Sequence, residues 1–287
     1  MNISLRILFQ QEAKRPLQET GEFSNDELQS VVLDLDSQSE RFRCFLRATR
    51  NAPGNWFNPI MQFTKKELDS AACYQLDCRK TLPESPRDYE WNDSHVESLD
   101  LVKTDAGTEI QLPDRLAVSK VVLLKSNMVA GLGEWLQEFL VHADVAAAFS
   151  AEGFSGFSLR PVFNSKTKMV HPDVHQLYSN AIMPPAELGR NAPPTDDGSV
   201  RQLGCLVYEN LEQYNLVDFN RTAEDWAALN MPLWVVSARV REFFIHNKFK
   251  GWAFRPVLAK GSEMHREYER LWDDLFEQVA INPNNHF

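Results

Sequence analysis

Hydrophobic and polar residues alternate along several short segments of the chain, as they do in strands with one buried face. The segments are 3–9, 30–36, 108–112, 119–124 and 203–208. Each of them predicts a strand. Two polar stretches that contain proline, 79–94 and 183–202, are typical of long loops.

Three segments predict helices. Thr64 and Glu67 have the spacing of a capping box that opens a helix reaching about Tyr74, and Thr222 and Asp225 indicate a shorter helix in the same way. The clearest helix spans 262–280, where apolar residues recur at helical spacing and form one broad face that must pack on the rest of the protein. That face consists of Met264, Tyr268, Leu271, Trp272, Leu275, Phe276 and Val279.

One pattern occurs twice in the chain. Residues 139–163 align without gaps to residues 234–258, and nine positions are identical. Chance would give about one or two identities at ordinary residue frequencies. Duplication of a supersecondary unit explains the match.

Both copies predict the same local structure. A short apolar strand leads to a helix, capped by Ser237 in the second copy, whose apolar face holds Phe149 in one copy and Phe244 in the other. A turn and an alternating second strand follow. We therefore expect a strand-helix-strand unit in each copy, with both of its strands in one sheet.

Six repeated residues have structural roles in this prediction. Gly156 and Gly251 lie in the turn, where a glycine permits unusual backbone angles. The pairs Arg160-Pro161 and Arg255-Pro256 come near the end of the second strand, where a missing N–H is tolerated. We expect each arginine to form a structural ion pair at the rim of the sheet rather than a ligand site.

These elements predict an α+β protein. The two duplicated units lie in a mixed sheet with flanking helices, and an additional α+β region precedes them. We place the boundary in the first long loop, which gives an N-terminal region of residues 1–95 and a C-terminal region of residues 96–287.

The charge balance restricts the partners. The chain has 30 Lys and Arg against 40 Asp and Glu, a formal charge of −10, which disfavours nucleic acid and favours a basic protein. The sequence contains no apolar run long enough to cross a bilayer and no secretory signal pattern. Four scattered cysteines fit a reducing compartment, so we expect a cytoplasmic protein without a membrane partner.

No motif for catalysis, a metal or a cofactor is complete. Cys73 and Cys78 lack further metal ligands at a sensible distance, and His171 and His175 are expected in a loop. Asp34 and Asp36 would share one face of a strand, which surface strands show routinely. We expect no enzyme, no cofactor and no metal site, although a hydrolase built from scattered carboxylates and histidines stays open as an alternative.

The last predicted helix has an acidic side opposite its apolar face. Glu263, Asp273, Asp274 and Glu277 fall together there. Such a stripe is usually the solvated surface of a helix. The other interpretation is a binding site for a basic partner. These four residues are the candidate partner-binding set.

The second copy also resembles a known kind of protein. The segment MPLWVVSARVREFFIHNKFKGWAFRPVL is similar to the C-terminal segment of immunity proteins from bacterial polymorphic and contact-dependent toxin systems, in particular the double-CxxCG-motif immunity proteins. The first copy, VHPDVHQLY and TAEDWAALN precede it in a similar order. The two CxxCG pairs are missing and only Cys205 lies where a pair is expected, so no zinc site is implied.

The resemblance implies a function without catalysis. Immunity proteins bind a cognate toxin and cover its active site, as in competition between bacteria that deliver toxins by type VI secretion. A non-catalytic structural or regulatory module is a further alternative. The sequence leaves open the toxin's activity, the contact surface, the oligomeric state and any role of Cys73 and Cys78.

Overall fold

The computed structural model describes residues 1–79, 81–82, 95–103, 109–118, 124–132, 136–164, 167–189, 203–224 and 232–287. The helices are α1 (Lys14–Glu19), α2 (Glu40–Ala48), α3 (Lys65–Ser70), α4 (Ala143–Glu152), α5 (Ala238–His246) and α6 (Glu263–Val279). The strands are β1 (Asn2–Leu8), β2 (Val32–Asp36), β3 (Trp56–Gln62), β4 (Cys73–Cys78), β5 (Thr81–Leu82), β6 (His95–Lys103), β7 (Glu109–Val118), β8 (Val129–Leu132), β9 (Leu136–His142), β10 (Ser158–Asn164), β11 (Val170–Tyr178), β12 (Val207–Tyr208), β13 (Phe219–Arg221), β14 (Trp234–Ser237), β15 (Trp252–Pro256) and β16 (Leu258–Ala259). Helices and strands in mixed sheets confirm the predicted α+β class.

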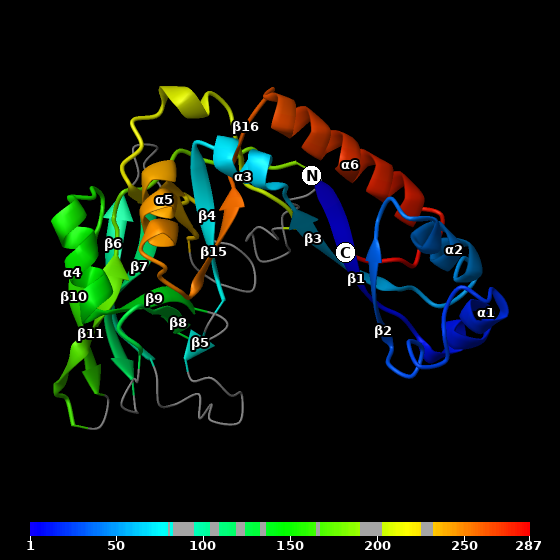
Figure 1. The fold of residues 1–287 in the computed structure, drawn as a ribbon, viewed down its shortest axis with the longest axis horizontal. Coiled ribbons are helices and arrows are strands. Elements are labelled where there is room, and N and C mark those ends of the chain that lie inside the picture. Colours follow the sequence, from blue (N-terminus) through cyan, green and yellow to red (C-terminus); the bar gives the residue numbers. More distant parts are fainter. Residues whose placement is uncertain are drawn as a thin grey trace.

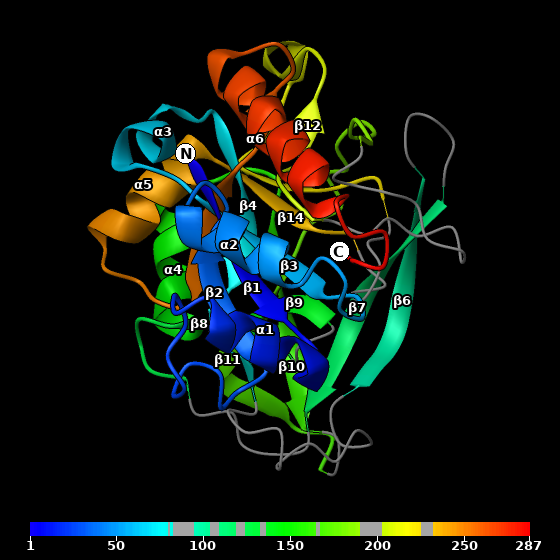
Figure 2. The same ribbon diagram turned by 90° about the vertical axis from the view of Figure 1, so that its right-hand side faces the viewer.

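The N-terminal strands form a small antiparallel sheet in the order β2-β1-β3. One face of this sheet is apolar, and α1, α2 and α6 cover it (Figures 1 and 2). Ile3, Leu5 and Ile7 of β1 are fully buried in that core, as their alternation predicts. Helix α6 confirms the predicted amphipathic helix, because Tyr268 and Leu275 of its apolar face pack into the same core.

Each duplicated segment folds into the predicted strand-helix-strand unit, but the two units lie in two separate sheets rather than in one mixed sheet. In the first copy β9, α4 and β10 follow one another, and β9 and β10 both run antiparallel to the strand between them, β11. In the second copy β14, α5 and β15 do the same around β4. Each unit is therefore strand-helix-strand, and both strands of each unit lie in one sheet.

The repeat extends beyond the aligned residues. Strand β8 borders β9 as β13 borders β14, and β7 runs parallel to β10 as β12 runs parallel to β16. Arg160 faces Gln176 on β11, and Arg255 faces Gln75 on β4. We call β7–β11 with α4 module 1, and β4, β12–β16 with α5 module 2.

The two central strands occupy exchanged places. Strand β4 precedes all of module 1 along the chain but lies in module 2, and β11 precedes the rest of module 2 but lies in module 1. A tandem duplication in which the two first strands changed places would give this arrangement. Since module 2 lacks its central strand without residues 73–78, module 2 is not a contiguous piece of chain, whereas the elements of module 1 follow one another between residues 109 and 178.

The modules also touch through matched backbone contacts. Phe219 of β13 donates its N–H to the carbonyl of Ser155 at 3.1 Å, and Val129 of β8 donates to the carbonyl of Lys250 at 2.8 Å. Ser155 and Lys250 occupy the same position in the repeat. Each module's turn therefore holds the outer strand of the other module.

The repeated glycines make this approach possible. Gly156 has a φ of +79° and Gly251 a φ of +114°, which side chains of L-residues disfavour. A Cβ on Gly156 would lie 2.4 Å from the carbonyl oxygen of Phe219, and one on Gly251 would lie 1.7 Å from that of Val129. Both glycines are thus required by the neighbouring backbone as well as by their own conformation.

Helices α4 and α5 and both sheets enclose one shared aromatic core. Phe139 and Trp234, which match in the repeat, pack against each other with ring centroids 5.9 Å apart. Phe243 of α5 lies 5.2 Å from Phe154 and 6.3 Å from Phe149 of module 1. Burial of large aromatic side chains is a dominant stabilising term, and here both modules contribute to it.

Several sequence predictions were wrong in detail. The capping box of Thr64 and Glu67 is present, but the helix ends at Ser70 and Cys73 begins a strand. Pairing of β4 with β14 and β15 overrides the local helical preference. Of the predicted strand 203–208, only the last two residues pair, as β12. Residues 119–123 of another predicted strand and 225–231 after Thr222 lie outside the described residues.

The division at residue 95 remains a prediction. In the structure, contacts cross that point in both directions. Strand β4, from the predicted N-terminal region, completes module 2, and α6, from the predicted C-terminal region, packs on the N-terminal sheet.

Substitution of the repeated glycines tests the interlocking contact. We expect Gly156→Ala and Gly251→Ala each to lower the free energy of unfolding by about 3 kcal/mol or more, because the new Cβ meets a backbone carbonyl. Gly153→Ala is the matched control, since Gly153 has a φ of +72° but open space around it, and we expect it to cost about 1 kcal/mol. Urea denaturation measures all three variants, and equal losses would contradict the contact.

Candidate interaction surface

The carboxylates considered for catalysis lie on an exposed strand surface. Asp34 accepts a hydrogen bond from Nε of Arg6 at 3.0 Å, and Asp36 accepts one from Nδ2 of Asn2 at 2.7 Å. Both aspartates point to solvent on the face of β2 opposite the core. Their partners and exposure are those of surface residues on a strand.

The candidate metal ligands are not brought together. Cys73 and Cys78 stand at the two ends of β4, and burial raises the pKa of the Cys73 thiol to about 12. His171 and His175 lie on strand β11 rather than in the expected loop. They are four positions apart along the strand, which corresponds to about 13 Å. Among the described residues, no group of three metal-binding side chains is present.

The best-buried charges form an ion pair between the modules. Arg221 of β13 donates to Glu138 of β9 at 2.8 Å, and the two side chains are only 2% and 1% exposed. The guanidinium also lies 4.4 Å from the ring of Trp234. Burial raises the pKa of Glu138, although Arg221 opposes that shift. Such an enclosed pair is not accessible to a ligand. We therefore assign it a structural role at the interface between the modules.

The repeated arginines form the expected ion pairs. Arg255 binds Asp77 at 3.0 Å and donates to the carbonyl of Gly204 at 3.2 Å. Arg160 binds Asp100 at 3.0 Å, contacts the carboxylate of Asp114 and donates to its carbonyl at 3.2 Å. The repeated hydrogen bond to a carbonyl indicates a structural role in both modules.

The acidic side of α6 faces solvent, but it is not purely acidic. Glu263, Asp273 and Glu277 are exposed, and Asp274 is half-buried. At 3.6 residues per turn, Arg270 falls on the same side of the helix. Arg270 binds Glu267 at 2.7 Å and Asp274 at 2.8 Å. Asp274 is therefore already neutralised in part within the helix.

The outer face of the N-terminal sheet carries a row of apolar side chains. Val32, Leu8 and Trp56 lie side by side across the three strands and are 36%, 45% and 49% exposed. The ring of Trp56 also packs at a tilt against that of His286, with ring centroids 4.8 Å apart. Large apolar side chains at aligned, solvent-facing positions are characteristic of interaction sites.

Sequence reasoning did not find this row. Its signal is present in the chain, since Leu8 and Trp56 occupy positions where the alternation of their strands calls for a polar residue. Their alignment, however, depends on the register of three strands.

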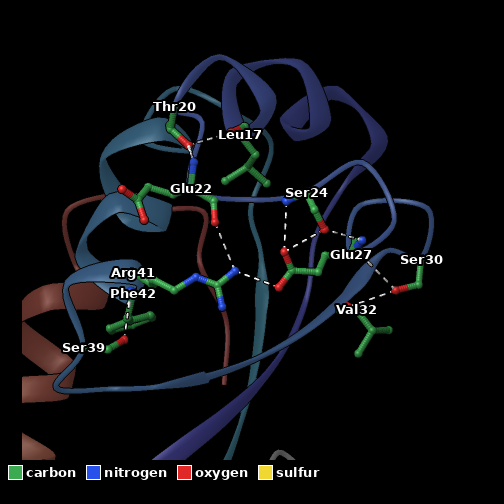
Figure 3. Close-up of polar contacts among 10 residues, drawn as sticks. All are labelled: Leu17, Thr20, Glu22, Ser24, Glu27, Ser30, Val32, Ser39, Arg41 and Phe42. Carbon is green, nitrogen blue, oxygen red and sulfur yellow. Dashed lines mark hydrogen bonds and ion pairs between the residues drawn. The ribbon is translucent and has the colours of Figure 1, made fainter.

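The loop that leads into β2 is fixed by a compact polar network (Figure 3). Arg41 of α2 donates to Oε1 of Glu27 at 2.7 Å and to the carbonyl of Glu22 at 3.2 Å. The N–H and hydroxyl of Ser24 both donate to the other carboxylate oxygen of Glu27. The Arg41 guanidinium and, after it, the bonds from Ser24 lower the pKa of Glu27 to about 2.

No protein-family model matches the chain, and no curated protein matches it significantly. Among the described helices, none has both the length and the apolar character needed to cross a membrane. The function is therefore argued from the residues and surfaces of this chain.

The Glu27 network predicts a pH dependence. The folded pKa lies below the ordinary value of 4.5, so the network stabilises the fold above that value and loses its effect as the pH falls towards 2. We expect the effect to be at most about 1 kcal/mol, because both side chains are partly exposed. Thermal unfolding of the wild type and of Glu27→Gln between pH 5 and pH 2 measures it. The two melting curves should converge at low pH, and a constant difference would contradict the assignment.

Proposed function

We propose that this chain is an immunity protein that binds a bacterial toxin in the cytoplasm and covers its active site without catalysing a reaction. The observation that carries the proposal is the duplicated unit. The segment with the resemblance to immunity proteins, 234–258, and its copy, 139–163, fold alike and join into one body. The proposal requires neither a metal nor a cofactor.

The packing of the modules suits an inhibitor that works by occupying a surface. Exchanged strands, a shared aromatic core and a buried ion pair hold the two modules in one arrangement. A preorganised surface loses little conformational entropy on binding, which favours a tight complex. A stable complex of this kind buries about 1,200 to 2,000 Å² and depends on a few aromatic or charged anchors. Trp56 is an exposed aromatic side chain of the required type.

The charge of the chain favours a basic partner. With a formal charge of −10, the protein attracts a cationic toxin domain over a distance of about one Debye length. This attraction mainly increases the association rate. Rapid association protects a cell that receives a toxin from outside.

Co-expression tests the proposed function. The chain is produced together with the product of each adjacent gene in turn, and a product that kills the strain on its own is taken as the candidate toxin. We expect growth to be rescued and the two proteins to co-purify in a 1:1 complex. Rescue without any complex would support the alternative of an enzyme, and failure of both rescue and binding would refute the proposal.

Charge reversal tests the acidic side of α6. If it contacts the toxin, replacement of Asp273, Asp274 and Glu277 by lysine should slow association at least tenfold at low salt and reduce its salt dependence. The matched control replaces the exposed Glu209, Glu212 and Glu242 by lysine, which changes the net charge equally. Surface plasmon resonance at several salt concentrations measures the rates. Equal effects of the two triple variants would mean that only the overall charge matters.

A further inference from the structure

The N-terminal sheet has one strand edge that is open and one that is covered. Backbone hydrogen bonds join Phe9 to Val31 and Ser37 to Ile3, so the odd-numbered residues of this segment pair with β1. Because hydrogen-bonded positions alternate in an antiparallel pair, the backbone groups of Val32, Asp34 and Asp36 point away from β1. Among the described strands, β1 alone pairs with β2.

The opposite edge of the sheet is occupied. On β3 the N–H of Phe57 donates to the carbonyl of His286 at 2.8 Å, so the C-terminal residues extend the sheet there. Pro59, the next outward-pointing residue, has no N–H to offer. Of the two described edges of this sheet, that of β2 is therefore the better one for an additional strand.

The free edge of β2 is limited to its centre. The carbonyl of Val32 accepts from the Ser30 hydroxyl at 3.0 Å, and that of Asp36 accepts from the Ser39 hydroxyl at 2.7 Å (Figure 3 shows the first contact). In the described part of the chain, both the N–H and the carbonyl of Asp34 remain without a hydrogen-bond partner. The edge thus presents a donor and an acceptor at Asp34, with the N–H groups of Val32 and Asp36 on either side.

The side chains beside this edge define what fits it. Val32 ends the apolar row that continues through Leu8 to Trp56, so an apolar residue placed beside Val32 would extend the row. Asp34 and Asp36 place two carboxylates farther along the same edge. Arg6, which faces Asp34 from β1, pairs with Asp34, and among the described residues no ion pair includes Asp36. A lysine or arginine beside Asp36 would balance the remaining charge.

We propose that the edge of β2 receives an extended segment of the toxin, with an apolar residue beside Val32 and a basic residue beside Asp36. This inference rests on the proposed function and names the contact that it uses. Addition of a strand gives affinity through main-chain hydrogen bonds, and the adjacent side chains give specificity.

The carboxylates on this edge are consistent with such a role. Charged side chains on an edge strand prevent indiscriminate pairing with other chains. They also disfavour binding of any segment without a matching positive charge. The edge can therefore bind a basic segment while it excludes others. The Arg41–Glu27 network fixes the loop before β2, so the edge is held in place before binding.

Two variants at one position test this contact. Asp34→Pro removes the central N–H of the edge without breaking a bond to β1, and Asp34→Ala is the control that removes the carboxylate alone. With the toxin identified by the co-expression experiment as the probe, we expect Asp34→Pro to bind about tenfold or more weakly than Asp34→Ala. Circular dichroism melts of both variants establish that they fold.

Amide hydrogen exchange in the wild-type complex provides a test without substitutions. The amides of Val32, Asp34 and Asp36 should exchange more slowly when the toxin is bound, whereas those of Leu33 and Leu35, already bonded to β1, should not change. A complex in which the three outward amides stay unprotected would overturn the inference and leave the proposed function standing. Absence of any complex would refute the proposed function, and the inference with it.

Discussion

The structure depends on the close approach of each module's turn to the other module's outer strand. Ser155 and Lys250 accept matching backbone hydrogen bonds from Phe219 and Val129, and a glycine follows each of them. Any side chain at these glycines would meet a carbonyl oxygen. This contact explains why a glycine occurs at the same position in both copies, since each turn binds the outer strand of the other module.

The exchanged strands turn this contact into a property of the whole molecule. Strand β4 is separated from the rest of module 2 by all of module 1, so loss of module 1 would also disturb the chain that supplies β4. The buried ion pair of Arg221 and Glu138 lies at the interface between the modules, and each module supplies only one of the two charges. A surface carried by such a body keeps its shape, which a protein that acts by covering a partner requires.

Local signals in the sequence predicted local structure well. The repeat, the Ser237 cap and the apolar face of α6 all depend on residues close together in the chain, and all three are present. The end of α3 was missed because it depends on partners of β4 about 160 residues away. The pair of Arg221 and Glu138 gave no local signal. The apolar row on the N-terminal sheet could not be predicted, because it depends on the register of three strands, which the sequence does not reveal. The carboxylates of α6 could be identified from the sequence, but their role in binding is still a prediction.

Native-state hydrogen exchange of a Val235→Ala variant tests most directly whether the two modules are one cooperative body. Val235 is buried in module 2, on the side of its sheet away from the shared aromatic core. If the modules unfold together, the slowest amides of β9 and β11 in module 1 should lose the same free energy of opening as those of β14 and β15. Unchanged protection in module 1, with a loss confined to module 2, would contradict the account.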